Sequence, residues 1–557
     1  MQWCSACLGV LMHRGASPTV GGRTLVNWYR TRARSAALIA AIALLACGGG
    51  GGGAPGDQLA PAVSSVSPLD QATISAGNST VAVTFSEAID CSKANATALV
   101  VTEGTTAVPG SVSCSGNKLS FTAAAGLPTD ATLSAKVDAS IVDLAGNRLA
   151  STYSWTFRVG PWTVQTGTSA ADSVGAVAVD ASGNLYLVGA SAGSLDGGPN
   201  AGLFDAVLIK YDRFGIRQWS RQFGSVADEI ALAVAVDGAG NVYVGGVSDG
   251  HIDGATPNSA SGAFVAKFDS AGSRRWIRQI SSGQYEMVRS LAVDAAGDVV
   301  AAGYTTGDLF APYAGGGADL YVLKLDGDGN LKWGRQFGTS RTDNASGVAV
   351  DAQRNVFVVG YTFGGGANAG SADVLVAKYD ANGVSQWMQQ FGTADLDVAS
   401  GVAIGPGGSL YVVGRTEGSF AGETNAGGQD AFVARLDASG HLAWLRLIGS
   451  GADEMARGLA VDATGNVMVV GETTGTLTGA ASAGASDGFL AKFDQSGTRL
   501  WLRQFGTPGN ESVTSVGVDG GGNAFVAGQT SGSFDGKANL GDSDLLLLKF
   551  GSDGTKR

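Results

Sequence analysis

A carboxylate recurs at one fixed place in the second part of this chain. It stands eight residues before the aspartate that ends each VAVD-like segment, or before Gly405 in the copy that lacks this aspartate. The seven carboxylates are Asp172, Glu229, Glu286, Asp343, Asp397, Glu454 and Glu511. Carboxylate oxygens are the ligands that calcium prefers. A ring of them could therefore hold calcium or a cationic ligand.

A structural role explains the same carboxylates and is favoured. Each could cap its own loop or pair with an arginine that stands two residues after a recurring tryptophan, since ion-pair networks also gather charged groups. These arginines are Arg221, Arg278, Arg335, Arg446 and Arg503. Gln389 and Val164 replace the arginine in two copies. If a cation does bind, Asp397 and Asp172, which follow those copies, should be its ligands.

No catalytic residue emerges from the other polar motifs. Beyond residue 47 the only histidines are His251 and His441. We expect them on opposite faces of the fold, which excludes most histidine-based acid–base, triad and metal schemes. DGDGN at 326–330 resembles the start of a calcium loop, but Phe337 occupies the twelfth position, where the loop needs glutamate. It is therefore read as a hairpin turn.

The composition describes an acidic chain that can bury a core. Lys plus Arg is 36 and Asp plus Glu is 48, which gives −12, and 44% of the residues are hydrophobic. Five arginines and no acidic residue precede Cys47, so the chain from Cys47 onward carries 31 minus 48, or −17. Nucleic-acid binding needs a basic footprint and is not expected.

The N-terminal segment is typical of an export signal. Three arginines at 30, 32 and 34 precede an apolar run at 36–46 that ends in LLAC. Eleven helical residues rise about 16 Å, roughly half of a bilayer core, which argues against a membrane span. LLAC resembles the lipobox of bacterial lipoproteins, which implies a lipid-modified Cys47; an ordinary signal with an incidental cysteine is the alternative. Residues 1–47 are thus read as a signal peptide and 48–60 as a Gly-rich tether. Gly48 after the cysteine resembles the sorting of lipoproteins to the outer membrane.

Residues 61–159 are predicted to form a small β-sandwich. Short alternating runs are separated by Gly, Asn, Asp and Pro. The phrases VTFSEAID (83–90), DLAGN (143–147) and YSWTF (153–157) resemble bacterial Ig-like domains. Cys91 and Cys114 are its only cysteines. In an oxidising compartment a disulfide is favoured over two free thiols.

The rest of the chain, residues 161–557, consists of seven repeats of one sequence unit. Tryptophan recurs at 162, 219, 276, 333, 387, 444 and 501, at intervals of 57 residues with one of 54. Each unit reads as four strands by its alternation and its β-branched and aromatic content. Four-stranded units at this period predict propeller blades. VAVDxxGNxYVxG with WxRQFG resembles the bacterial β-propeller repeat family called SBBP, which implies a seven-bladed propeller. The last unit lacks its tryptophan strand, and 162–167 should supply it and close the ring, because an open array leaves strand edges unpaired.

The expected protein is therefore all-β, an Ig-like sandwich followed by a seven-bladed propeller. The first functional hypothesis is a monomeric, lipid-anchored envelope protein whose non-catalytic propeller binds a protein or polysaccharide partner. A propeller lyase or hydrolase is the second, and a purely architectural surface protein the third. No cofactor is expected beyond the calcium considered above. Specificity should lie in the long loops. Examples of these loops are Ser191–Phe204, His251–Gly262 and Thr416–Gln429.

Overall fold

The computed structural model describes residues 57–557 except 125, 196–199, 253–261, 365–370, 478, 480 and 481. The signal segment, Cys47 and most of the tether lie outside the described residues, as do parts of two of the long loops. The described chain is almost entirely β-structure. Among the described residues, no helix has the length and apolar character needed to span a bilayer.

The first domain is a sandwich of two sheets. One has the order β1 (Val63–Ser67), β3 (Thr80–Phe85), β7 (Lys118–Ala123) and β6 (Gly110–Ser115). The other has the order β2 (Thr73–Ile74), β9 (Tyr153–Val159), β8 (Ala131–Val137), β4 (Leu99–Glu103) and β5 (Thr106–Ala107). Alternate residues of β8 and β9 are buried, as a two-layer packing requires.

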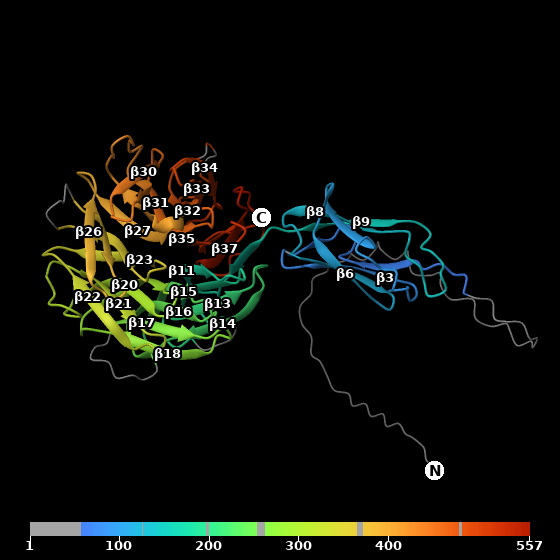
Figure 1. The fold of residues 1–557 in the computed structure, drawn as a ribbon, viewed down its shortest axis with the longest axis horizontal. Coiled ribbons are helices and arrows are strands. Elements are labelled where there is room, and N and C mark those ends of the chain that lie inside the picture. Colours follow the sequence, from blue (N-terminus) through green and yellow to red (C-terminus); the bar gives the residue numbers. More distant parts are fainter. Residues whose placement is uncertain are drawn as a thin grey trace, which may run out of the picture. The chain divides into compact units, whose positions relative to one another are not determined.

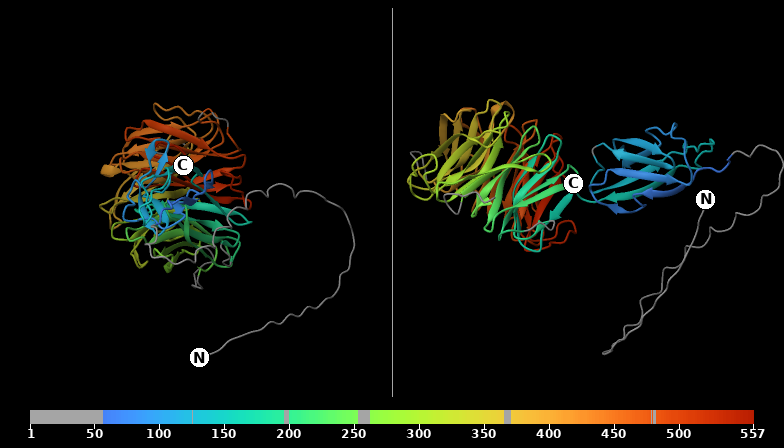
Figure 2. Two further views of the ribbon diagram at one scale, coloured as in Figure 1. Left: turned by 90° about the vertical axis from the view of Figure 1, so that its right-hand side faces the viewer. Right: turned by 90° about the horizontal axis from the view of Figure 1, so that it is seen from below.

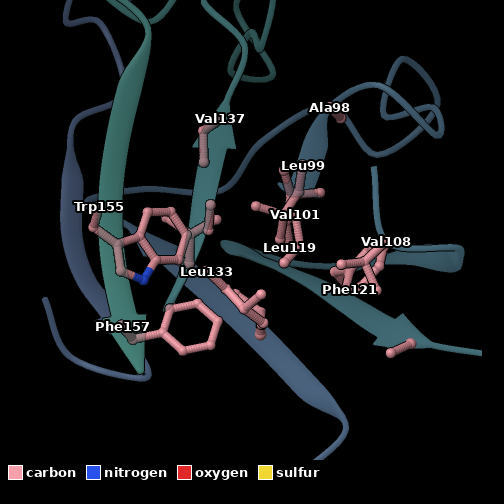
Figure 3. Close-up of a cluster of buried hydrophobic side chains, with 14 of the residues drawn as sticks. Ala98, Leu99, Val101, Val108, Leu119, Phe121, Leu133, Val137, Trp155 and Phe157 are labelled. Carbon is pink, nitrogen blue, oxygen red and sulfur yellow. The ribbon is translucent and has the colours of Figure 1, made fainter. Parts of the chain in front are cut away.

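The core of this sandwich gathers around aromatic side chains. Figure 3 shows Trp155 and Phe157 of β9 beside Leu133 of β8, with Leu99 and Leu119 also in the cluster. All five are at most 2% exposed. The two cysteines predicted to pair are joined: Cys91 and Cys114 form a disulfide with their Cα atoms 5.5 Å apart.

Seven four-stranded antiparallel sheets form the second domain, a β-propeller (Figure 1). We number the blades 1–7 by their innermost strands. These are β11 (Asp172–Val179), β15 (Glu229–Val236), β19 (Glu286–Val293), β23 (Asp343–Val350), β27 (Asp397–Ile404), β31 (Glu454–Val461) and β35 (Glu511–Val518). The second strands are β12 (Leu185–Ser191), β16 (Val242–Ser248), β20 (Val299–Thr305), β24 (Val356–Thr362), β28 (Leu410–Thr416), β32 (Val467–Thr473) and β36 (Ala524–Thr530).

The third and outer strands complete each blade. The third strands are β13 (Asp205–Tyr211), β17 (Gly262–Phe268), β21 (Asp319–Leu325), β25 (Asp373–Tyr379), β29 (Asp430–Leu436), β33 (Asp487–Phe493) and β37 (Asp544–Phe550). The outer strands are β14 (Arg217–Phe223), β18 (Arg274–Ile280), β22 (Leu331–Phe337), β26 (Ser385–Phe391), β30 (Leu442–Ile448), β34 (Arg499–Phe505) and β10 (Thr163–Thr166). Figure 2 shows the blades from two further directions.

The ring closes between the two ends of the propeller sequence. β10 pairs with β37 in antiparallel register, from Thr163 opposite Leu548 to Thr166 opposite Leu545. Trp162 N also donates to the carbonyl of Arg557 at 2.6 Å. Blade 7 is thus built from three strands at the C-terminal end and one from the N-terminal end.

Apolar layers between neighbouring blades hold the ring together. One layer combines Leu185 and Ile209 of blade 1 with Phe525 and Leu547 of blade 7. The other layers repeat this pattern, with aliphatic residues of the second and third strands facing the next blade. The second and third strands of a blade are covered on both faces by the neighbouring blades. Their sequences are therefore continuous apolar runs, as in β12 and β13, and do not alternate between apolar and polar residues.

In five blades the recurring tryptophan and arginine join the outer strand to a turn of the next blade. Trp276 Nε1 donates to the carbonyl of Gly327 at 3.0 Å, and Arg278 Nε donates to the carbonyl of Gly329 at 3.0 Å. The guanidinium lies 5.6 Å from the centre of the Trp276 ring. Gly329 has a φ of +81°, and a Cβ there would lie 2.9 Å from the ring. The tryptophans therefore pack between blades and offer no open aromatic platform.

Each innermost strand carries a β-bulge that plain alternation does not predict. The pairing of β11 with β12 skips one residue between Val174 and Ala176, and the other six blades skip the equivalent residue. The skipped residues are Gly175, Leu232, Arg289, Ser346, Ser400, Arg457 and Thr514. A bulge re-aims the side chain of its extra residue.

Candidate functional site

The seven predicted carboxylates all occupy the same structural position. Each is the first residue of an innermost strand, and each is at most 1% exposed. The connection that precedes this strand comes from the outer strand of the previous blade. The carboxylates therefore lie at the junctions between blades, on the side where the connections between second and third strands also emerge.

Each of these carboxylates accepts hydrogen bonds from the loop that precedes its strand, and it thereby caps that loop. Glu511 accepts from the backbone N–H of Thr507 at 2.8 Å, from its hydroxyl at 2.6 Å, and from the hydroxyl of Thr530 at 2.7 Å. Thr507 begins the connecting loop, and Thr530 ends the second strand of the same blade. The Ser or Thr four residues earlier donates to the carboxylate in every other blade as well. These residues are Thr168, Ser225, Ser282, Thr339, Thr393 and Ser450.

The arginines do not pair with these carboxylates, contrary to one of the alternatives above. Their side chains donate to turn carbonyls of the next blade, as Arg278 does. The guanidinium is positioned by its tryptophan and lies in the outer strand, away from the strand start where the carboxylate is buried. The absence of arginine at Gln389 and Val164 therefore gives no reason to single out Asp397 and Asp172 as cation ligands.

A second carboxylate accompanies the first at six of the seven junctions. It is the first residue of the third strand in the preceding blade. These partners are Asp205, Asp319, Asp373, Asp430, Asp487 and Asp544. Gly224 shows how closely the two meet, since a Cβ there would lie 2.4 Å from Asp205 Oδ1 and 2.5 Å from Glu229 Oε2. Two buried carboxylates thus share one junction, and a glycine makes room for them.

Burial and this neighbour both act on the pKa of the carboxylates. Burial raises the pKa of Asp397, and the negative charge of Asp373 raises it further, against the hydrogen bonds of Thr416 and Thr393. The pKa of Asp172, Glu454 and Glu511 is raised by burial in the same way, with a smaller contribution from the partner carboxylate.

Blade 2 departs from this pattern at two positions together. Its third strand begins with Gly262 instead of Asp, and Ser281 stands where the other junctions have the glycine. A Cβ on Gly262 would lie 3.2 Å from Ser281 Cβ. Where the carboxylate is replaced by Gly262, the junction glycine is replaced by Ser281. The glycine at the other six junctions is therefore needed to make room for the carboxylate.

A cation is not required to explain these pairs. Calcium takes six to eight oxygen ligands, whereas six of the junctions bring two carboxylates together and the junction after blade 2 has one. Calcium binding by the seven residues stays a prediction. The described residues contain one group of three carboxylates close enough to share an ion, Asp57, Glu87 and Asp143 of the Ig-like domain. There Asp143 already accepts hydrogen bonds from Ala145 and Asn147.

The central channel contains a second polar group that the carboxylate pattern did not reveal. A cavity of about 440 Å³ is lined by the bulge residues of all seven blades, from Gly175 to Thr514. The bulge thus turns one residue of every blade toward the axis. In blades 3 and 6 this residue is an arginine, Arg289 and Arg457.

Arg415 and Glu472 join Arg457 in this cavity. They are the penultimate residues of the second strands of blades 5 and 6, beside the long-loop face. Arg457 Nε lies 3.5 Å from Glu472 Oε1, an ion pair without a hydrogen bond. Arg415 Nη1 donates to Met455 Sδ at 3.2 Å, and Arg415 Nε is buried without a partner among the described residues. Burial lowers the pKa of Arg415, and the like charge of Arg457 lowers it further.

Tyr361 of blade 4 borders the same group. Its hydroxyl accepts a hydrogen bond from Asn344 Nδ2. For Arg415, Tyr361 and Glu472 the sequence holds a signal, because they occupy one position of the repeat at which the blades differ. At the Arg415 position the other blades have Ala190, Val247, Tyr304, Tyr361, Glu472 and Gln529.

The histidines take no part in this group of residues. His251 follows β16, and His441 is exposed in the turn between β29 and β30, beside Asp437.

Comparison with known proteins identifies both domains. A model of the bacterial Ig-like domain matches residues 57–159, and a model of the β-propeller repeat matches 218–253, 332–366 and 500–535. The chain therefore carries a bacterial Ig-like domain followed by SBBP β-propeller repeats, as the sequence predicted.

Two curated proteins resemble parts of the chain. Regulatory protein FlaEY of Caulobacter vibrioides is 27% identical over 398 residues, which cover 61% of this chain and 41% of that protein. An uncharacterised WD repeat-containing protein of Acanthamoeba polyphaga mimivirus is 24% identical over 168 residues, which cover 25% of this chain and 12% of that protein. The chain thus spans less than half the length of either relative.

Two solved structures that match parts of the chain are distant from it in sequence. A Bacteroides caccae protein of unknown function is 12% identical with a TM-score of 0.33, and the match covers 57% of this chain and 93% of that one. Puromycin hydrolase is 13% identical with a TM-score of 0.42, and the match covers 70% of this chain and 54% of that one.

Proposed function

We propose that this protein is a lipid-anchored envelope protein whose propeller is a non-catalytic binding or adhesion platform for a protein or polysaccharide partner. In this proposal Cys47 holds the chain in the outer membrane, and the Ig-like domain is a spacer. The partner binds the propeller on the face where the long loops and the channel mouth lie. The protein itself is a monomer.

One observation carries this proposal. The residues repeated in all seven blades are accounted for by packing, by turns and by the caps of the loops. Polar residues that differ between blades, above all Arg415, Arg457 and Glu472, gather at the channel mouth. A surface that departs from the repeat at one place supports selection for a ligand there, since the packing does not need it.

Binding to isolated envelope polymers tests this function. Purified chain is mixed with the polysaccharide and the outer-membrane proteins of its own cell, and association is measured by biolayer interferometry. The polymer is then analysed by size-exclusion chromatography. We expect saturable binding and a polymer of unchanged length. Shortened polymer would contradict the non-catalytic proposal, and the absence of binding to any fraction would contradict the platform.

A lyase or hydrolase is the second candidate, and Tyr361 is the observation that favours it. A tyrosine hydroxyl can serve as a general acid or base, and this one lies beside Arg415, with which it interacts electrostatically. Tyr361→Phe separates the two functions. It would abolish polymer shortening by an enzyme, whereas a platform would keep most of its binding.

A further inference from the structure

The channel mouth concentrates positive charge in a chain that is acidic as a whole. The cavity lining contains three arginines, Arg289, Arg415 and Arg457, and one carboxylate, Glu472, which gives a net charge of +2, while the whole chain carries −12. Glu472 is only partly available to the arginines, because its Oε1 also accepts from the Ser512 hydroxyl at 2.7 Å. The guanidinium groups of Arg415 and Arg457 come from the neighbouring blades 5 and 6, and the bulge in β31 turns Arg457 toward Arg415.

The hydrogen-bond donors of these arginines are poorly used. A guanidinium offers five N–H donors in a planar fork that fits an oxyanion with two acceptor oxygens. Arg415 uses one on a thioether sulfur, a weak acceptor, and keeps its buried Nε unpaired among the described residues. Arg457 Nε also lacks a hydrogen bond. Buried cationic donors left in this state favour the entry of an anion that accepts from both.

The space around the arginines suits a small polyhydroxy molecule. Hydroxyl groups of Ser290, Ser400, Ser512 and Thr514 line the cavity of about 440 Å³ together with backbone atoms. A second hollow of about 410 Å³ shares Glu472 and Ser512 with it and extends to Ser543 of blade 7. Small-ligand sites commonly have such volumes. The two hollows together can accept adjoining units of a chain rather than one isolated ion.

We propose that the channel mouth binds an acidic saccharide, with one monoanionic group, a carboxylate or a sulfate ester, held between Arg415 and Arg457. The net positive charge of the lining suits a negatively charged group, and the free donors of Arg415 and Arg457 suit its oxygens. The hydroxyl-rich walls match the sugar. This inference rests on the proposed binding function and specifies its ligand class.

Isothermal titration calorimetry with three probes tests the site. Glucuronate, glucose 6-sulfate and uncharged glucose are titrated into the full exported chain and into Arg415→Gln and Arg457→Gln. Arg499→Gln is the matched control, because Arg499 is exposed on the outer strand β34 and its loss removes the same charge. We expect at least one of the two anions to bind wild type at least tenfold more tightly than glucose does. Each channel substitution should weaken that binding at least tenfold, and the control should leave it unchanged.

The two anions also identify the source of the charge. Binding of glucuronate alone assigns the site to uronates, and binding of glucose 6-sulfate alone assigns it to sugar sulfates. Equal affinity of wild type and both channel variants for the anions, or failure of both anions to bind, would overturn the proposal. Arg415→Lys separates geometry from charge. It keeps the cation but loses the planar fork, so its affinity should also fall.

Two further outcomes separate this site from the platform function. If an envelope polymer binds wild type and both channel variants equally, the platform stands and the site is refuted. If the small anions bind as expected and no polymer does, the site stands and the platform is refuted. Melting temperatures check folding, and Arg415→Gln should not melt below wild type, because it removes a buried charge and its repulsion with Arg457.

Discussion

At the scale of single residues, the buried carboxylate pairs give this propeller a defined response to pH. For an acid whose pKa is raised on folding, the folded state binds more protons than the unfolded state between the two pKa values. The free energy of unfolding therefore falls as the pH rises through that range. Asp172, Asp397, Glu454 and Glu511 are of this kind. We therefore expect a higher melting temperature at pH 5 than at pH 7.5.

Two aspartates act in the opposite direction, but at lower pH. Burial opposes the ionisation of Asp294, yet Lys324 and Arg354 hold its pKa at about 2. Asp462 has a pKa of about 2 as well, because Thr464, Asn466 and Lys492 outweigh its burial. Their stabilisation is present above the pKa of an unfolded aspartate, roughly 4, and is lost as the pH falls toward 2. Stability should therefore be greatest in mildly acidic solution.

Asp397→Asn tests the carboxylate pair directly. The asparagine side chain keeps an oxygen that can accept the hydrogen bonds of Thr393. It also removes the negative charge of Asp397, which is repelled by Asp373. We expect its melting temperature at pH 7.5 to rise by roughly 1–3 °C and its difference between pH 5 and pH 7.5 to shrink. Asp380→Asn, in the turn between β25 and β26, makes the same change of charge at a partly exposed position and keeps an oxygen to accept from Asn382 and Val384, so it should preserve the wild-type difference. Scanning calorimetry at both pH values measures this. A lower melting temperature for Asp397→Asn at pH 7.5 would refute the explanation.

Calcium removal is the second test at this scale. Each of the seven carboxylates accepts at least one loop-capping hydrogen bond, and no more than two carboxylates meet at a junction. We therefore expect melts with calcium and with chelator to agree within about 1 °C. Stabilisation by calcium that disappears in the double variant Asp172→Asn, Asp397→Asn would instead establish a cation site.

At the scale of elements, the junction between blades shows why one glycine position repeats. In Gly224→Ala the new Cβ would meet Asp205 and Glu229 at about 2.5 Å. We expect a loss of about 1–3 kcal/mol in the free energy of unfolding, as for other overpacked sites. The double variant Gly224→Ser, Asp205→Gly reproduces the combination found in blade 2 and should recover most of this loss. Urea unfolding of the single and double variants measures the coupling, and strictly additive effects would argue against it.

The closing strand gives a second prediction at this scale. Removing residues 162–167 exposes the edge of β37, whose Leu545–Leu548 segment is buried. An unpaired apolar edge favours aggregation. We expect a lower melting temperature and oligomers in size-exclusion chromatography. A variant in which Gly and Ser replace these residues keeps the chain length and should behave in the same way. Unchanged melting of both variants would mean that the ring does not depend on β10.

Most of the architecture could be predicted from sequence, and the binding group could not. The recurring tryptophans and the residues that end the VAVD-like segments are spaced by the same intervals, and because one interval is one blade, this spacing predicts the number of blades. The alternating runs within one interval predict its four strands. The seven carboxylates that begin the innermost strands could be found in the sequence for the same reason, because they recur once in every interval. Their partners, such as Asp205, are far away in sequence and meet them only across a blade junction. Arg457 reads as an ordinary strand residue, and it is the β-bulge, which the alternation of residues does not predict, that brings it to Arg415.

At the scale of the whole molecule, the anchor and the platform can be tested separately. The basic flank, the short apolar run and LLAC predict that Cys47 carries lipid. Cys47→Ser should move the exported protein from the membrane fraction to the soluble fraction, measured by ultracentrifugation and immunoblotting. Cys91→Ser provides a control that removes a cysteine without touching the anchor. Membrane association of Cys47→Ser equal to that of wild type would contradict lipidation.

The bulges have a consequence for how this propeller can diversify. In each blade one residue faces the axis while remaining outside the pairing of its sheet, so a change at Ser346, Ser400 or Thr514 alters the channel without altering the packing between blades. Ligand chemistry and stability are then encoded by different residues. Related chains can acquire new specificities through the six bulge positions that carry a side chain, and an engineer can use the same six positions to design a pocket in this ring. Gly175 is the exception, because a Cβ there would lie 2.2 Å from the carbonyl oxygen of Ala231 in the neighbouring blade.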